Sequence, residues 1–85
     1  MIQFTTMQYF VRTMEMHKES KRAFSPELPC SGLVAARNEA KRIVLDAPRE
    51  MMLQADACFR NRIGVRTKYR CWINERGEFQ ERELI

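Results

Sequence analysis

Residues 33–47 constrain the fold more than any other stretch, because their apolar side chains recur three and four positions apart. These apolar residues are Leu33, Val34, Ala36, Ala40, Ile43, Val44 and Ala47. The spacing predicts an amphipathic helix, with Ser31 as its N-cap and Pro48 as the residue that stops or kinks it. The apolar stripe of a single helix has to pack against another surface, which the rest of the chain must supply.

A second apolar pattern follows within residues 49–60. It consists of Met51, Met52, Ala55, Cys58 and Phe59. Their three-four spacing predicts a second helix, or a continuation of the first helix beyond a kink at Pro48. This second stripe also requires a partner surface, and we expect that surface to be a sheet.

Residues 63–74 instead follow the two-residue alternation of a strand. One face would carry Val65, Thr67, Tyr69, Cys71 and Ile73, and the other Arg66, Lys68, Arg70 and Trp72. Residues 74–77 have turn-forming side chains with a glycine at the end, so residues 78–84 are predicted to return as an antiparallel partner strand.

The first third of the chain fits two descriptions. Phe4, Met7, Phe10, Val11 and Met14 form a helical stripe, yet the same segment is rich in aromatic, threonine and valine residues that favour strands. We predict a strand over residues 8–16, since a two-stranded hairpin alone is marginal in water and a third strand would complete a sheet. A helix over this segment is the alternative. Residues 18–30 then form a long connection that either spans a sheet edge or contacts a partner.

These elements predict an α+β fold with a small antiparallel sheet, made of the N-terminal strand and the C-terminal hairpin. One kinked helix or two consecutive helices would pack on it, in the order β-α(α)-β-β. The 85 residues fit a single domain. If methionines Met7, Met14 and Met16 occupied both faces of the first strand, one face would need cover, which would favour a homodimer.

Composition argues against several classes of function. The three cysteines are widely spaced and the single histidine has no second imidazole nearby, which predicts neither a disulfide framework nor a metal site. No glycine-rich phosphate loop or acid–base pair is present, so we expect neither an enzyme nor a cofactor. The chain shows neither a signal peptide nor a long apolar span, and we expect a cytoplasmic protein without membrane contact.

The basic strand is the candidate binding surface. Arg66, Lys68, Arg70 and Trp72 would lie on one face, where cations could contact phosphates and the indole could stack on a base. The net charge of +4 is compatible with this reading. We therefore predict a small non-enzymatic module that binds nucleic acid or a nucleoprotein complex.

The register of the hairpin decides whether this face is free. If Ile73 pairs with Glu78, then Glu81 and Glu83 oppose Arg70 and Lys68 and cancel much of their charge. If Asn74 pairs with Glu78 through a three-residue loop, Arg70 instead faces Arg82. Two like charges in that position cost stability unless an anion lies between them.

In size, order of elements and the helical phrases Leu33-Val34 and Glu39-Ala40-Lys41-Arg42-Ile43, the chain resembles small phage-encoded anti-CRISPR inhibitors of type I systems. That resemblance implies a protein-binding regulator or inhibitor from a phage or mobile element. The loop at residues 24–28 and the hairpin would then contact the target. The chain is also similar to small ribosome-dependent ribonuclease toxins, which implies phosphate and proton-handling roles for Lys68, Tyr69 and Arg70.

Overall fold

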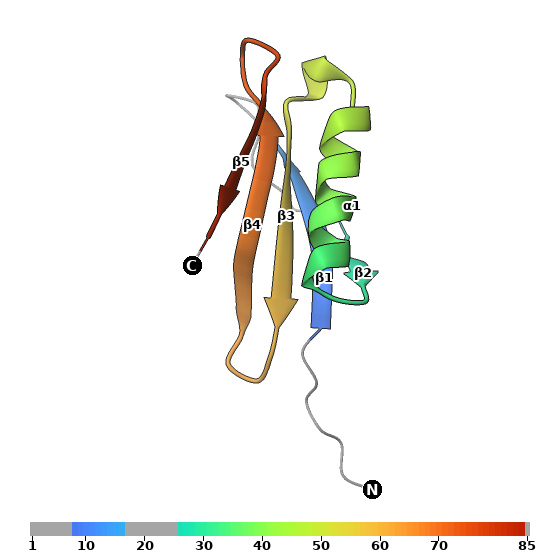
Figure 1. Ribbon diagram of the computed structural model, residues 1–85, viewed down its shortest axis with the longest axis vertical. Helices are drawn as coiled ribbons and strands as arrows, with labels where there is room; N and C mark the ends of the chain where they lie inside the picture. The colour runs from blue at the N-terminus through green and yellow to red at the C-terminus, as the bar shows by residue number, and fades with distance from the viewer. Residues whose placement is uncertain (1–7, 17–25, 85) are drawn as a thin grey trace, which may run out of the picture.

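A five-stranded antiparallel sheet carries one helix on one of its faces (Figure 1). The computed structural model describes residues 8–16 and 26–84. Its elements are β1 (Gln8–Glu15), β2 (Leu28–Cys30), α1 (Leu33–Asp46), a 3₁₀ turn (Arg49–Met51), β3 (Leu53–Arg60), β4 (Val65–Ile73) and β5 (Phe79–Glu83). The strands lie in the order β2-β1-β3-β4-β5, so β3 is the central strand. The α+β class and the C-terminal hairpin are confirmed, and so is the strand predicted over residues 8–16, which forms as Gln8–Glu15.

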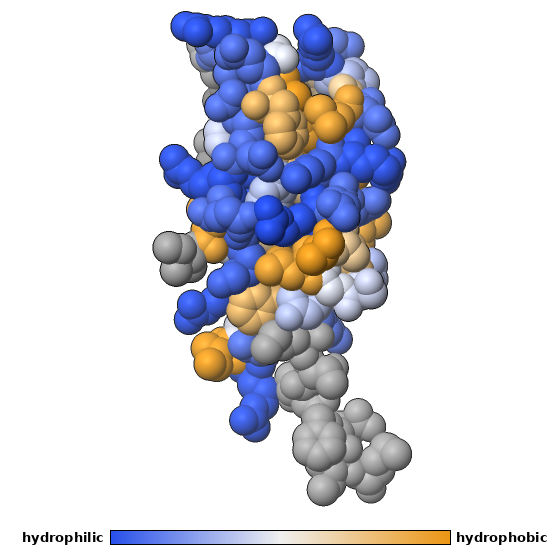
Figure 2. All heavy atoms as spheres, in the orientation of Figure 1, coloured by the Kyte–Doolittle hydropathy of each residue, from blue (hydrophilic) through white to orange (hydrophobic). Residues whose placement is uncertain are grey.

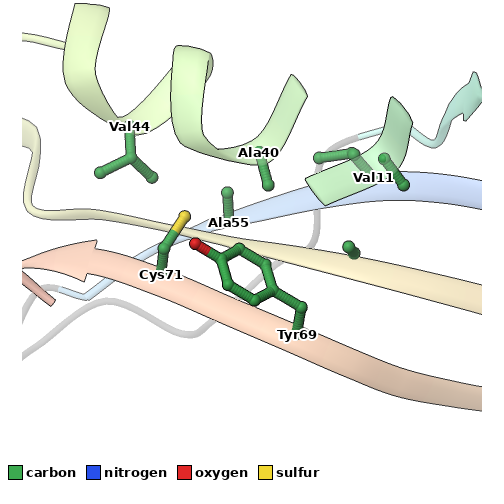
Figure 3. Packing of buried hydrophobic residues seen from close by; sticks show 8 residues of the cluster. Val11, Ala40, Val44, Ala55, Tyr69 and Cys71 are labelled. Atoms are coloured by element: carbon green, nitrogen blue, oxygen red, sulfur yellow. The ribbon is translucent and has the colours of Figure 1, made fainter. Parts of the chain in front are cut away.

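The helix α1 packs through small side chains on both sides of the interface. Ala36, Ala40 and Val44 are its buried residues, and Ala40 lies above Ala55 of β3 in the core (Figure 3). Alanine on both surfaces lets the helix backbone approach the sheet closely, while Tyr69 fills the space beside it. The cluster beneath α1 therefore relies on close approach and on the ring of Tyr69.

Only the N-terminal end of α1 differs from the prediction. Gly32, and not Ser31, is the N-cap, and no side chain caps the first turn by hydrogen bonding. At the other end, the amide of Ala47 donates to the carbonyl of Ile43 at 3.0 Å, and the chain leaves the helix before Pro48. The predicted N-cap was wrong, and the predicted C-terminal end is confirmed to within one residue.

The helix predicted over residues 49–60 was wrong, because most of this segment forms the central strand β3. Only the single 3₁₀ turn at its start is helical. Alanine, methionine and glutamine favour helices in isolation, but β3 is buried on both faces, where alternating and helical apolar patterns look alike. Pairing with both β1 and β4 overrides the local preference. Residues 8–16 and 26–84 therefore contain one α-helix.

The sheet has a further strand that the sequence pattern did not reveal. Residues 28–30 form β2, which pairs with β1 along the edge, with Phe10 opposite Pro29. Proline donates no hydrogen bond, and an edge strand is where a sheet tolerates it. The connection expected over residues 18–30 thus ends in the sheet, and residues 17–25 lie outside the described part of the chain.

The β4–β5 hairpin adopts the second of the two predicted registers. Asn74 pairs with Glu78 through a three-residue loop, and its side-chain oxygen accepts hydrogen bonds from the amides of Arg76 and Glu78, both at 2.9 Å. Gly77 has φ +81°, a conformation in which glycine is unstrained. In this register Arg70 lies directly opposite Arg82.

Candidate nucleic-acid interface

A bulge in β4 divides the four predicted site residues between the two faces of the sheet. Ala57 of β3 pairs with Tyr69, but the next residue, Cys58, pairs with Thr67, so Lys68 is an extra residue. Alternation therefore changes phase at Lys68. Arg70 keeps its predicted face, whereas Arg66 turns to the other one.

We call the face opposite α1 the distal face. Arg70 and Trp72 lie on it, since the intervening Tyr69 and Cys71 pack against the helix. Arg66 pairs with Phe59, and the Nζ of Lys68 lies 5.8 Å from the centre of the Phe59 ring. Phe59 is on the α1 side of the sheet, two residues after Ala57. The predicted four-residue face is thus two pairs, each on its own side.

An internal carboxylate holds Arg70 on the distal face. Asp56, 1% exposed, accepts hydrogen bonds from the Nε of Arg70 at 2.9 Å and from its Nη2 at 3.2 Å. Gln54, also buried, donates to the same carboxylate at 3.2 Å. The hydrogen bonds that Arg70 donates to Asp56 raise the pKa of its guanidinium. The carboxylate fixes the plane of the guanidinium and leaves its Nη1 donors for another acceptor.

Arg82 extends the positive charge from Arg70 to the neighbouring strand. It is exposed, and its side chain makes no hydrogen bond or ion pair in the described parts of the chain. Both arginines line a groove of about 320 Å³, which we call the distal groove. Its lining consists of Met16, Gln54, Arg70, Trp72 and Arg82. An adjoining groove of about 220 Å³ shares Met16 and Trp72 with it, so the indole borders both.

The acidic residues of β5 lie on the opposite face. Glu81 accepts a hydrogen bond from the Tyr69 hydroxyl at 2.6 Å and lies 3.6 Å from the Nζ of Lys41. Glu83 forms an ion pair with Arg37 of α1. The hydrogen bond from Tyr69 lowers the pKa of Glu81. Neither glutamate neutralises Arg70, which answers the question that the register left open.

The residues of the ribonuclease interpretation do not come together. Tyr69 is 1% exposed beneath α1, with the Arg37 guanidinium 5.0 Å from its ring centre, whereas Arg70 points to the distal face. Burial raises the pKa of the Tyr69 hydroxyl above its ordinary value, and the hydrogen bond to Glu81 raises it as well. Tyr69 and Arg70 therefore lie on opposite faces of the sheet.

Sequence reasoning missed Asp56, Gln54 and Arg82 as site residues. Asp56 falls within residues 49–60, for which the sequence pattern predicts a helix that does not form. Arg82 appeared only as a consequence of the second hairpin register, and that register was the available signal. Within the part of the chain that the structure describes, no group of three or more His, Cys, Asp or Glu side chains could hold a metal ion.

Comparison with known proteins assigns the chain to no family. The chain matches no protein-family model, no curated protein and no solved structure. The resemblance to anti-CRISPR inhibitors stays a prediction. Over residues 8–16 and 26–84, no helix is long and apolar enough to cross a membrane.

Proposed function

We propose that this protein binds single-stranded nucleic acid in the distal groove. Trp72 stacks on a base, and Arg70 and Arg82 contact the phosphates beside it. The observation that carries the proposal is the pairing of two arginines across β4 and β5 next to a half-buried tryptophan.

The arginine pair is the electrostatic argument for this site. Side chains directly opposite each other on antiparallel strands start only about 5 Å apart at Cβ, so Arg70 and Arg82 repel one another. Asp56 compensates Arg70 from within the sheet, but Arg82 keeps its full charge towards solvent. A bound phosphate would accept hydrogen bonds from both guanidinium groups and relieve the repulsion.

The tryptophan is the argument for a single strand. A base can stack on a sheet side chain only when it is unstacked from its neighbours, as in single strands and loops. Such stacking contributes about 1–3 kcal/mol per base and depends little on sequence. The groove continues on both sides of Trp72, which leaves room for the nucleotides before and after the stacked base.

A protein-binding inhibitor is the second candidate, and one observation favours it. Val34 and Leu45 are 70% and 61% exposed and lie three turns apart on the outer side of α1. Apolar side chains in such positions can anchor a protein partner. Figure 2 shows the α1 side of the molecule as mostly hydrophilic, with separate hydrophobic patches between the charged side chains.

A salt series of fluorescence anisotropy titrations tests the proposal. Labelled single-stranded DNA and RNA are titrated with wild type, Arg82→Ala, Trp72→Ala and the control Arg76→Ala. Arg76 is an exposed hairpin arginine outside the distal groove, so its loss matches the charge change alone.

We expect Arg82→Ala to weaken binding and to reduce the slope of log affinity against log salt by about 0.7, the value for one lost phosphate contact on a single strand. Trp72→Ala should weaken binding about fivefold or more at every salt concentration. Equal effects of Arg82→Ala and Arg76→Ala would refute the groove as the site. Absence of binding by folded wild type at low salt would refute nucleic-acid recognition.

A further inference from the structure

We infer that the connection between β3 and β4 is a second nucleic-acid contact, which inserts Ile63 as an apolar wedge into a duplex adjoining the single strand. We call residues 61–66 the hairpin tip. It projects beyond the first turn of α1, at the lower end of the sheet in Figure 1. The inference rests on the proposed function, because it takes a nucleic acid as the partner.

Hydrogen bonds within the hairpin tip present Ile63 to solvent. The side-chain oxygen of Asn61 accepts from the amides of Ile63 at 2.8 Å and Gly64 at 3.2 Å. The amide of Asn61 also donates to the carbonyl of Gly64 at 3.0 Å, which closes the turn. Gly64 has φ +149°, a conformation that L side chains rarely adopt. The turn is therefore fixed by the residues around Ile63, and the isoleucine itself contributes little to holding it.

Ile63 is 86% exposed, which is more than any other large hydrophobic side chain in the described ranges. Val65 beside it is 39% exposed, so the tip has a small apolar end. Burial of an isoleucine side chain releases roughly 1.5–3 kcal/mol, and this chain leaves that contribution unused. A ligand that covers the tip would gain it.

The charged side chains along the sequence around this apolar end are positive, and the neighbouring carboxylate of Glu27 is already paired with Arg60. The sequence has no carboxylate between Asp56 and Glu75, whereas Arg62 and Arg66 flank the tip. Neither guanidinium makes an ion pair or hydrogen bond with the described residues. Lys68 lies next along the strand, over the Phe59 ring. The partner must then carry negative charge on both sides of an apolar slot.

A nucleic-acid duplex has that chemistry. Proteins that kink duplexes place an apolar side chain between adjacent base pairs while arginines contact the flanking groove and phosphates. The hairpin tip combines both components within residues 62–66. A duplex step supplies two stacked apolar faces between two phosphate rows, which complements Ile63 between Arg62 and Arg66.

The hairpin tip and the distal groove lie on the same strand, and this defines the class of partner. Trp72 lies six positions after Arg66, which corresponds to about 20 Å along β4. A duplex with a single-stranded overhang would occupy both contacts at once: the overhang in the distal groove and the duplex end at the tip. We therefore infer a partial duplex as the substrate, in preference to a single strand alone.

The experiment compares three ligands: a single strand, a blunt duplex, and the duplex with that strand as its overhang. A fluorescent base analogue, which brightens when unstacked, replaces the last paired base of the duplexes. Wild type, Ile63→Ala and Val34→Ala are titrated by anisotropy and by analogue fluorescence. Val34 is a matched control because it is an exposed apolar residue on the outer side of α1 and does not line the distal groove.

We expect wild type to bind the overhang duplex about tenfold more tightly than the single strand and to brighten the analogue. Ile63→Ala should lose about fivefold in affinity for the overhang duplex and lose the brightening, with unchanged binding of the single strand. Val34→Ala should match wild type on all three ligands.

Two results would overturn the inference while the proposed function stands. One is an Ile63→Ala variant that binds the overhang duplex as wild type does, with single-strand binding intact. The other is an unchanged analogue signal when wild type saturates the duplex. Absence of single-strand binding by wild type would instead refute the proposed function, and the inference with it.

Discussion

The two faces of the β4–β5 hairpin have opposite electrostatic arrangements, although they are built from alternate residues of the same two strands. On the α1 side, Glu81 and Glu83 are compensated by Lys41 and Arg37 of the helix. On the distal face, Arg70 and Arg82 lie opposite each other. The buried carboxylate of Asp56 accepts hydrogen bonds from Arg70. Compensation is complete on one face and incomplete on the other.

This difference separates stability from binding. The compensated face closes over Tyr69, the largest fully buried side chain among the described residues, and joins α1 to the sheet edge. The distal face retains a positive charge that the described residues do not satisfy. Substitutions on the first face should therefore change the free energy of unfolding, and those on the second should mainly change binding. Asp56 belongs to both.

Replacing Asp56 should change the free energy of unfolding more than the other substitutions, because its buried carboxylate compensates the charge of Arg70. Asp56→Ala leaves Arg70 facing Arg82 without an internal anion. Breaking a fully buried ion pair costs about 3–5 kcal/mol, and the 37% exposure of the Arg70 side chain lowers the expected cost to about 2–3 kcal/mol. Urea denaturation measures the loss. The double variant Asp56→Ala with Arg70→Met should recover part of it. A loss below about 1 kcal/mol in Asp56→Ala would contradict the assignment of Asp56 as the compensating charge.

Removing the Tyr69 hydroxyl should lower the free energy of unfolding without creating a cavity in the core. Tyr69→Phe keeps the ring beneath α1 but deletes the 2.6 Å hydrogen bond to Glu81, with an expected cost of about 1–2 kcal/mol. Chemical denaturation provides the value, and binding in the distal groove should be unchanged. A variant that lost nucleic-acid binding while keeping its stability would show that the two faces are not separable.

The same hydroxyl should make the protein sensitive to alkali. Tyrosine in an unfolded chain ionises near pH 10, whereas burial holds the pKa of Tyr69 above that value. The stability contributed by the neutral hydroxyl is thus present below pH 10 and is lost as the pH rises further. Thermal melts from pH 8 to 11 should fall more steeply for wild type than for Tyr69→Phe. Parallel profiles would contradict this role.

Reversing the charge of Arg82 should give the smallest change in stability and the opposite sign. Arg82→Glu converts a like-charge pair with Arg70 into an opposite-charge pair, worth about 0.2–1 kcal/mol of added stability. The same variant should lose single-strand binding. Denaturation and anisotropy on one preparation measure both effects. Lower stability in Arg82→Glu would mean that the Arg70–Arg82 repulsion is absent.

Much of the fold was predictable, because its signals are local. The periodicity of α1 and the alternation of β4 each fall within one element, and the Asn74–Gly77 turn has its own chemistry. The central strand β3 was not predictable in this way. Its side chains are buried on both faces, so helical and extended patterns become indistinguishable, and only pairing with β1 and β4 decides.

The candidate site was predictable only in part, because its residues meet through long-range pairing. Arg70 and Trp72 were identified from alternation, and Arg82 followed from one of two registers. Asp56 could not be found without β3. The separation of Arg66 from Arg70 results from an extra residue in β4, and nothing in the composition of residues 65–69 marks that irregularity.

At the bulge β4 has one residue more than β3, and this extra residue decides on which face of the sheet each cation of β4 lies. A single codon inserted between those of Ala57 and Cys58 would give β3 the matching residue and restore regular pairing with β4. Lys68 and Arg66 would then turn to the face of Arg70, and the irregularity would pass to the pairing of β3 with β1. One insertion could thus gather four cations on one surface without changing any existing side chain, a short evolutionary path between two different surfaces.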